Sequence, residues 1–418
     1  MSHVATASEA PISAAQIRVV ALCALVTLIE GIDLTLIPVL GPKITAALSI
    51  SAGGWGIILS TNPIGLIAGG VGVGYLADRI GRRNALIAAM SLMTVGTLAT
   101  TFANNFSEVL ICRLVTGVSF GGVIPVAVAL VSESLPPRVR ASTVAFVFLG
   151  QAGGGLLAAL IVKIPVPDAP WQTSVYYVTA GCALVTLLLT TLLPESPRYL
   201  LVRGGRRNRL RDLFKEGRAP GTTLLWLTFI GVCAPVSFFT TWLTSMIAAA
   251  GKANDVGVNG IAWYSAGAML GGLVLPLFAR RWHVNKVLLG TIVLAVVSCV
   301  AMGASLRLED TVTLVVATIC GVFVSGAFFM LYPPAARFYP THIRATGIGS
   351  AVAFGRIGNT ISPLATGFML NSGTDPSTVF YVMATPMVLS CVALIAFDRL
   401  TGTRTVAAGA DADAAEEA

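Results

Sequence analysis

Twelve apolar stretches follow one another through this chain, and each is long enough to cross a lipid bilayer as a helix. They begin near residues 18, 54, 84, 106, 141, 173, 222, 258, 284, 311, 343 and 376. About 20 apolar residues span the hydrocarbon core of a bilayer. Only 11% of the residues are charged and 55% are hydrophobic, whereas a soluble domain has about 25% charged residues. The sequence therefore predicts an all-α integral membrane protein with twelve transmembrane helices.

Basic residues are unevenly distributed among the predicted loops. If the N-terminus is cytoplasmic, most of them fall in internal loops, tails and span ends, and the external loops hold only Lys43, Lys163, Lys252 and Arg307. Cytoplasmic loops of membrane proteins carry an excess of Lys and Arg. We therefore expect a multi-pass protein of the cytoplasmic (inner) membrane with both termini cytoplasmic. The net charge of +8 is then a topology signal, and nucleic acid is not an expected partner.

A polar linker divides the twelve stretches into two sets of six. We predict a cytoplasmic N-terminal tail (1–17), a first six-helix bundle (18–193), a cytoplasmic linker (194–221), a second six-helix bundle (222–400) and a disordered tail (401–418). A shift of 204 residues lays Pro136–Ser142 over Pro340–Thr346 and Gly154 over Gly358. Such an internal repeat indicates two related halves, which in this class of membrane protein place a binding site between them near the midplane.

Two carboxylates, Glu30 and Asp33, lie inside the first apolar stretch. Residues three apart share a helix face, and about seven residues at 1.5 Å each separate Asp33 from the end of the span. An acid within a membrane span is a functional-site candidate, often for a proton or ion. All three histidines lie in the N-terminal tail or in loops, so the acids are the predicted proton carriers. The alternative is a pair of acids that snorkel into the headgroups.

Two arginines lie within spans. Arg113 is about 10 Å below the outer surface, at the depth of Asp33, so a salt bridge is predicted to be possible, and protonation of Asp33 would free Arg113 for an anion. A static ion pair is the alternative. Arg356 is roughly 20 Å from the cytoplasmic start of its span, and its guanidinium matches a carboxylate. Alternatively, Arg356 binds a helix carbonyl or an acid such as Glu133 and only holds helices together.

Aromatic and amide side chains in the spans complete the candidate binding residues, although each is equally open to a role in helix packing. The candidates for stacking on an aromatic ring are Phe238, Trp242, Tyr264 and Tyr332. The candidates for a hydrogen bond to a ring hydroxyl are Gln151, Asn62 and Asn359. The seven cysteines have no paired spacing, so neither a disulfide nor a metal site is expected.

The loop after the second stretch reads Gly74-Tyr75-Leu76-Ala77-Asp78-Arg79-Ile80-Gly81-Arg82-Arg83, and here the chain resembles the major facilitator superfamily. The resemblance implies the two-bundle fold of that superfamily, with this loop as a latch between the halves on the cytoplasmic side. Glu133 is expected to pair with an arginine of the loop as a gate residue. The candidate latch residues are Gly74, Asp78, Arg79, Gly81, Arg82, Arg83, Glu133, Arg140 and Arg344. The alternative is a basic loop that only fixes orientation.

The segment Glu30-Gly31-Ile32-Asp33 is similar to the first-span signature of the aromatic acid:proton symporter family, and the similarity covers nearly the whole chain. It implies a proton-coupled importer of an aromatic carboxylic acid, of hydroxybenzoate or hydroxyphenylpropionate type, that works by alternating access and serves aromatic catabolism. The resemblance assigns proton coupling to Glu30 and Asp33 and substrate binding to Arg113 and Arg356. No enzyme activity and no cofactor beyond the proton gradient are expected, and the protein is expected to be a monomer in the bilayer.

The chain departs from this family at one loop. After the eighth stretch the family usually has an acid, whereas this chain has Arg280-Arg281-Trp282, which puts the second latch in question. An exporter, or a porter for sugars or other organic acids, is the alternative within the superfamily. A binding or sensing protein without transport is a further alternative.

Overall fold

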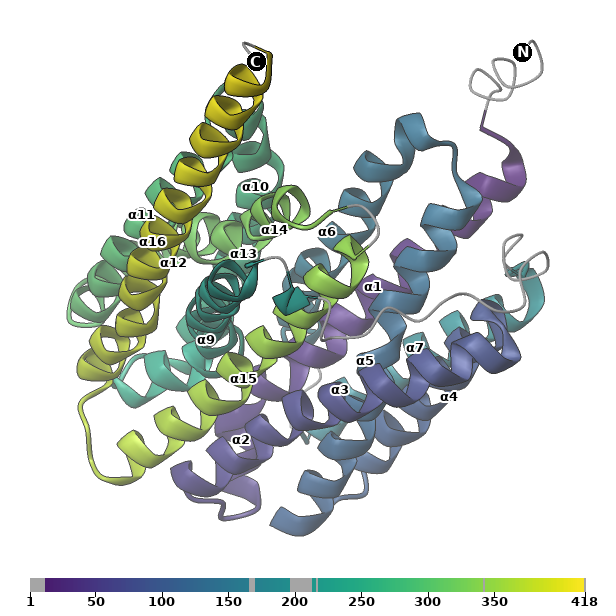
Figure 1. Cartoon of the computed structure of the whole chain (residues 1–418). Helices are drawn as coiled ribbons and strands as arrows, with labels where there is room; N and C mark the ends of the chain where they lie inside the picture. Colours follow the sequence, from purple (N-terminus) through teal and green to yellow (C-terminus); the bar gives the residue numbers. More distant parts are fainter. Residues whose placement is uncertain (1–11, 165–169, 196–212, 216, 341–342, 417–418) are drawn as a thin grey trace.

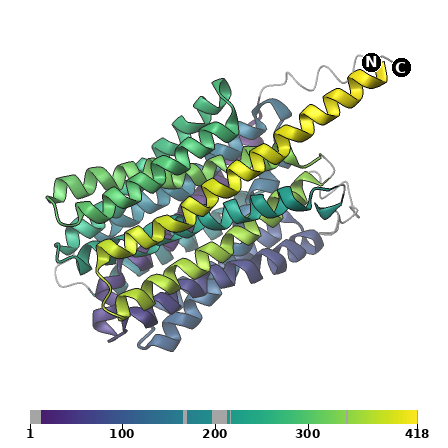
Figure 2. The same cartoon turned by 60° about the vertical axis from the view of Figure 1, so that its left-hand side comes forward.

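The computed structural model describes residues 12–164, 170–195, 213–215, 217–340 and 343–416. Long helices dominate it and run side by side in two groups (Figures 1 and 2). The helices of the first group are α1 (Ala14–Val39), α2 (Gly41–Ala47), α3 (Ala52–Ile80), α4 (Arg82–Thr100), α5 (Phe106–Ser134), α6 (Pro137–Val162) and α7 (Gln172–Leu192). Those of the second are α9 (Ala219–Ala249), α10 (Asn254–Arg281), α11 (Val284–Ser305), α12 (Asp310–Cys320), the π-helix η3 (Gly321–Ser325), α13 (Gly326–Met330), α14 (Tyr332–Phe338), α15 (Arg344–Asn371) and α16 (Pro376–Glu416).

Helix lengths and apolar surfaces fit a membrane protein. Within the described residues, nine helices are long and apolar enough to cross a membrane, and α4, α6 and α15 are not among them. Large apolar side chains such as Leu389 and Val392 are more than half exposed, as expected where lipid replaces water as the solvent. Each predicted stretch corresponds to a helix or, from α12 to α14, to a broken helix. The prediction of twelve spans is consistent with this arrangement.

Local sequence signals fix several helix ends. Ser13 and Gln16 form a capping box at the start of α1, in which the Ser13 hydroxyl accepts from the Gln16 N–H and the Gln16 side chain accepts from the Ser13 N–H. The Ser51 hydroxyl caps α3 and the Asn105 side chain caps α5 in the same manner. These side chains satisfy backbone N–H groups that have no partner inside their helix. Gly81, at φ 96°, permits the sharp turn between α3 and α4.

Glycines allow the closest helix contacts, and the internal repeat is visible in them. A Cβ on Gly154 of α6 would lie 2.3 Å from the carbonyl oxygen of Leu28 in α1. A Cβ on Gly358 of α15 would lie 2.3 Å from the carbonyl oxygen of Ile230 in α9. The two glycines that the 204-residue shift superimposes therefore make equivalent backbone contacts in the two groups, as small residues do between membrane helices.

The two groups meet closely at the end of the molecule opposite the chain termini. A Cβ on Gly56 of α3 would lie 2.9 Å from the Cα of Gly367 in α15. At the same end the Lys163 ammonium donates a hydrogen bond to the Asn259 side chain. Both contacts join the first group to the second. This end of the molecule is therefore closed.

The groups are separated at the end that carries both termini (Figure 1). Three glycines lie near this end of α3 and α15: Gly72, Gly74 and Gly349. A Cβ added at any of them would have no atom of the described residues within 4 Å. The helices that touch at one end thus diverge at the other. The space between them opens toward the termini.

The last helix, α16, continues to Glu416, and alanine, the most frequent residue at its end, has the highest helix propensity. Disorder of the tail from residue 401 stays a prediction. Most of the predicted linker, residues 196–212 and 216, lies outside the described residues.

Candidate functional site

A cavity of about 660 Å³ lies between the two groups of helices. Its wall includes residues of α1, α3, α5 and α6 from the first group and of α9, α10, η3, α13, α14 and α15 from the second. Most of the lining is apolar. The polar side chains in the wall include Glu30, Asn62, Arg113, Gln151, Tyr264, Ser325, Tyr332, Arg356 and Asn359.

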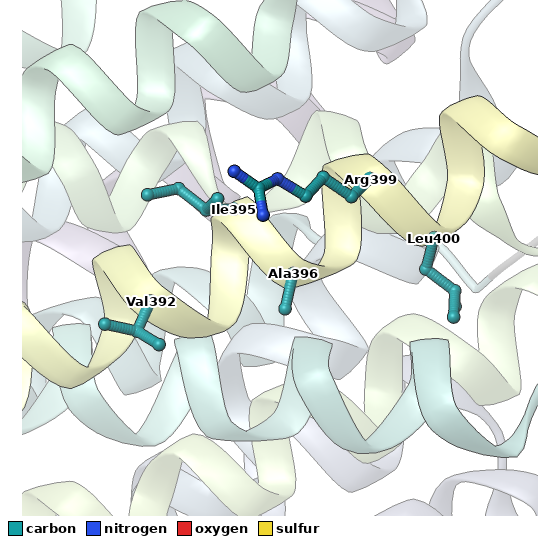
Figure 3. A pocket seen from close by; sticks show the side chains of 5 residues that line it. All are labelled: Val392, Ile395, Ala396, Arg399 and Leu400. Atoms are coloured by element: carbon teal, nitrogen blue, oxygen red, sulfur yellow. The ribbon is translucent and has the colours of Figure 1, made fainter.

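A second hollow, of about 480 Å³, lies on one helix only (Figure 3). Its lining residues, Val392, Ile395, Ala396, Arg399 and Leu400, all belong to α16. The apolar side chains and the single arginine follow the outside of this helix. This hollow is part of the surface that faces lipid, so the cavity between the groups is the candidate site.

Asp33 and Arg113 form a buried ion pair at the cavity wall. Asp33 is fully buried and Arg113 is 3% exposed, and their Oδ2 and Nη1 atoms are 3.2 Å apart. The predicted salt bridge is confirmed. Arg113 belongs to the cavity wall, so it lies between Asp33 and the space that a ligand would occupy.

Two threonines of α4 complete this ion pair. The Thr97 hydroxyl donates to Asp33 Oδ1 at 2.8 Å, and Arg113 Nη2 donates to the Thr100 hydroxyl at 2.9 Å. Hydrogen bonds of this kind offset the desolvation of a buried ion pair. These threonines were not predicted from the sequence. Their i, i+3 spacing on α4 was the available signal, but no pattern shows which face of α4 meets α1 and α5.

Glu30 lies one helical turn from Asp33 and has no hydrogen-bond partner for either carboxylate oxygen among the described residues. It is fully buried and is part of the cavity wall. Arg356, in the same wall, is the positive charge that attracts it. The burial of both acids contradicts the alternative that they extend into the headgroups. A carboxylate in such surroundings has the capacity to exchange a proton with the cavity.

Arg356 connects the two groups of helices across the cavity. It extends from α15, and its Nη1 donates to the carbonyl oxygen of Leu66 in α3 at 2.6 Å. The sequence predicted either a helix carbonyl or an acid such as Glu133 as a structural partner of Arg356, and the structure has the helix carbonyl. A guanidinium carries five N–H donors, so one such contact leaves donors that face the cavity for a carboxylate. Arg356 therefore has a structural contact and is also positioned to bind an anion.

Tyr264 is one of five aromatic residues in the cavity wall. Its ring stacks on Phe239 at a centroid distance of 5.2 Å and an interplanar angle of 4°. Its hydroxyl is 2.8 Å from the hydroxyl of Ser325, the last residue of the π-helix η3. π-Helical segments frequently occur at functional sites, and this one turns Ser325 toward the cavity.

The other predicted binding residues separate into two sets. Gln151, Tyr332 and Asn359 lie in the cavity wall, as predicted. Trp242 and Phe238 do not: the Trp242 indole donates to the Pro363 carbonyl, and Phe238 packs in the core against Phe239 and Phe380. The structure thus corrects the prediction for these two residues, because helix packing accounts for their burial.

The latch loop makes its described contacts within the first group of helices. Arg82 pairs with Glu133 at 3.6 Å, as predicted for Glu133. Arg83 donates from Nε to the Leu193 carbonyl at 2.6 Å and from Nη2 to the Thr190 carbonyl at 2.5 Å. These bonds tie α4 to the ends of α5 and α7. These contacts lie within the first group of helices.

Two of the remaining latch candidates, Arg79 and Arg344, contact residues that are four or five positions away in the sequence. The Arg79 guanidinium lies 4.4 Å from the ring centroid of Tyr75, and Arg344 Nε donates to the Tyr339 carbonyl. The side chains of Asp78, Arg140 and Arg280 lie outside the described residues. After α10, Trp282 is 64% exposed and stacks on Phe278. All seven cysteines are free thiols, and the described residues contain no His, Cys, Asp or Glu cluster for a metal ion.

Two groups of apolar helices surround a central, mostly apolar cavity that has charged residues in its wall and is open at one end and closed at the other. This arrangement is that of a membrane transporter. The family model of the Major Facilitator Superfamily matches residues 23–333. The chain belongs to this superfamily and is a transporter, not an enzyme.

Curated relatives match over nearly the whole chain. It is 32% identical to the 3-(3-hydroxy-phenyl)propionate transporter of Escherichia coli K12, covering 90% of this chain and 92% of that protein. It is 28% identical to the 4-hydroxybenzoate transporter PcaK of Pseudomonas putida, covering 93% and 94%. It is also 28% identical to the gallate transporter of Pseudomonas putida, covering 95% and 96%. Among solved structures, the D-xylose-proton symporter has a TM-score of 0.74 at 17% identity, covering 90% of this chain and 97% of that chain, which supports the fold.

Proposed function

We propose that this protein is a proton-coupled importer of an aromatic carboxylic acid of the hydroxybenzoate or hydroxyphenylpropionate type. The single observation that carries the proposal is that one cavity wall holds both Arg356 and Glu30, whose buried carboxylate has no hydrogen-bond partner among the described residues. The names of the relatives support the substrate class. The protein acts as a monomer in the cytoplasmic membrane, with both termini in the cytoplasm and the proton gradient as its energy source.

The substrate's carboxylate binds at Arg356. A guanidinium and a carboxylate form charge-assisted hydrogen bonds that are about twice as strong as neutral ones. The aromatic ring then lies in the apolar part of the cavity, beside Tyr264. Gln151 and Asn359 in the same wall add hydrogen-bonding groups around the ring. Arg113 provides a second positive charge when it is released from Asp33.

The two acids carry the coupling. Glu30 attracts Arg356 and therefore competes with a substrate carboxylate for it. Protonation of Glu30 removes this competition and the repulsion between Glu30 and the incoming anion. Protonation of Asp33 likewise weakens its hold on Arg113. A proton taken up from outside thus favours binding of the anion, and the empty cavity favours the ionised acids.

Alternating access moves the occupied cavity from one side of the membrane to the other. The present conformation has its opening at the end of the termini, which we assign to the cytoplasm. The bundle of residues 18–193 rocks against that of residues 222–400 about the central site. Closure of the cytoplasmic end brings the latch loop against the second bundle, where the latch residues act as a gate.

Uptake of labelled 4-hydroxybenzoate and of 3-(3-hydroxyphenyl)propionate by cells that express the chain tests this function. Cells with the wild-type protein are expected to take up the acids, and a protonophore is expected to abolish this uptake. In Glu30→Gln, uptake is expected to lose its dependence on the proton gradient. Asp375→Asn is the matched control, since this acid is exposed and pairs with Arg307 away from the cavity. Uptake of both acids that persists without a proton gradient contradicts the coupling. Uptake of neither acid contradicts the substrate class, and efflux from loaded cells without uptake establishes an exporter.

A further inference from the structure

Asn62 is a polar group of the cavity wall to which the proposed transport cycle assigns no part. It lies on α3, is 8% exposed and belongs to the wall. Its Oδ1 atom is buried and has no hydrogen-bond partner among the described residues. Buried polar atoms almost always have a partner, and one that lacks it in a native structure requires an explanation. A bound ligand that donates a hydrogen bond provides one.

The position of Asn62 is fixed by the packing of α3 on α5. A Cβ on Gly117 of α5 would lie 2.4 Å from the Asn62 carbonyl oxygen, so the two backbones are in contact at this point. One turn further along, a Cβ on Gly65 would lie 2.6 Å from the Leu114 carbonyl oxygen. The α3 backbone therefore cannot shift to bring the carboxamide to another partner in α5. A hydrogen-bond partner for Asn62 Oδ1 would therefore come from the cavity.

Asn62 is aligned with Arg356 along one helix face. Arg356 donates to the carbonyl oxygen of Leu66, which is four residues after Asn62 on α3. Residues four apart lie on the same face of a helix, about 6 Å apart along the axis. The guanidinium and the carboxamide thus border the same cavity, more than one helical turn apart, because the Leu66 carbonyl points toward the C-terminal end of α3 and side chains lean toward its N-terminal end. This separation suits the two ends of a single six-membered ring with its substituents.

The wall around Asn62 is rich in hydrogen-bond acceptors. Both Glu30 oxygens lack partners in the described structure. Pro63 follows Asn62 inside α3 and has no N–H, so the Leu59 carbonyl receives no helical hydrogen bond from it; Leu59 also belongs to the cavity wall. A hydroxyl group of a ligand would donate to an acceptor of this kind.

We propose that Asn62 determines specificity by accepting a hydrogen bond from a ring hydroxyl of the substrate, whose carboxylate is bound by Arg356. This inference rests on the proposed function and names the residue that selects hydroxylated aromatic acids over acids without a ring hydroxyl. A site built to pair with a hydroxyl discriminates against the analogue that lacks it, because the buried acceptor is then left without a partner. Benzoate, with no hydroxyl, is the matched analogue of 4-hydroxybenzoate.

The test compares the KM for uptake of 4-hydroxybenzoate and of benzoate in the wild type, in Asn62→Leu and in the control Thr61→Val. Thr61 is the adjacent residue, and its hydroxyl donates within its own helix, to the Ile57 carbonyl. Loss of one hydrogen bond is expected to raise the KM for 4-hydroxybenzoate about tenfold in Asn62→Leu. The KM for benzoate should change less than about twofold, and Thr61→Val should change neither.

Asn62→Ser keeps an acceptor in a smaller side chain and provides a second variant if the leucine substitution prevents folding. It is expected to retain part of the preference for the hydroxylated acid. An equal rise in KM for both acids, or an unchanged ratio, would overturn the role of Asn62. Wild-type cells that transport neither acid would instead contradict the proposed function, so the two failures are distinguishable.

Discussion

Replacing Asp33 by asparagine should destabilise the protein strongly, and removing Arg113 as well should restore most of the loss. The carboxylate is fully buried and 3.2 Å from the Arg113 guanidinium. In Asp33→Asn the guanidinium stays buried without its counter-charge, a loss of about 3–5 kcal/mol. The double variant Asp33→Asn/Arg113→Gln buries two neutral amides, and Thr97 and Thr100 remain available as hydrogen-bond partners.

Thermal unfolding of the detergent-solubilised protein measures this effect. We expect a clearly lower Tm for Asp33→Asn and for Arg113→Gln, and a Tm for the double variant above that of either single variant. Non-additivity of this kind is what residues in contact show in a double-mutant cycle, where interaction energies reach about 0.5–3 kcal/mol. Uptake assays on the same three variants separate stability from transport, because the stable double variant still lacks both charges and is expected to be inactive.

Two results would refute the reasoning. If Asp33→Asn unfolds at the wild-type temperature, the ion pair carries no net stabilisation and the Arg113 charge is compensated elsewhere. If the losses of the two single variants simply add in the double variant, the residues act independently, and the exchange of Arg113 between Asp33 and a substrate loses its basis.

Three further predictions concern other parts of the structure. In Gly154→Val the Cβ would lie 2.3 Å from the Leu28 carbonyl oxygen, so size-exclusion chromatography should show no folded protein. A Cβ at Gly290 would meet nothing within 4 Å among the described residues, so Gly290→Ala should fold like the wild type. Arg356→Lys keeps the charge but loses the planar fork, so the KM for an aromatic acid should rise about tenfold or more, and an unchanged KM would place the carboxylate elsewhere. Gly349 faces open space, so Gly349→Leu should leave the Tm within a few degrees but block closure of the terminal end. Uptake at the wild-type rate by this variant would disprove the prediction.

Much of the fold was predictable because a membrane span is recorded in consecutive residues. The depth of Asp33 and of Arg113 followed from a constant rise per residue, and the ion pair between them is present. The equivalence of Gly154 and Gly358 followed from the internal repeat, and both glycines lie at close backbone contacts. In each case the position of the residue along its own helix is sufficient for the prediction.

The contacts that the sequence did not predict depend on how neighbouring helices are rotated. Trp242 was expected at the ligand and lies in the core, because a helix with apolar residues on every face gives no sign of which face meets lipid, protein or cavity. For the same reason Thr97 was missed beside Asp33, and Leu66 as the acceptor of Arg356. Such contacts need the relative positions of two or three helices, which no local pattern specifies.

The hydrogen bond from Arg356 to the Leu66 carbonyl has a consequence for the energetics of the whole cycle. The donor belongs to the second group of helices and the acceptor to the first, so this bond is a tie between the two bundles in the unloaded protein. A carboxylate that binds the remaining donors of this guanidinium is held by the same side chain that joins α15 to α3. Occupancy and the tie between the bundles are then thermodynamically linked: whatever the bound anion does to the strength of the tie, a change in the tie does to the affinity for the anion by the same factor.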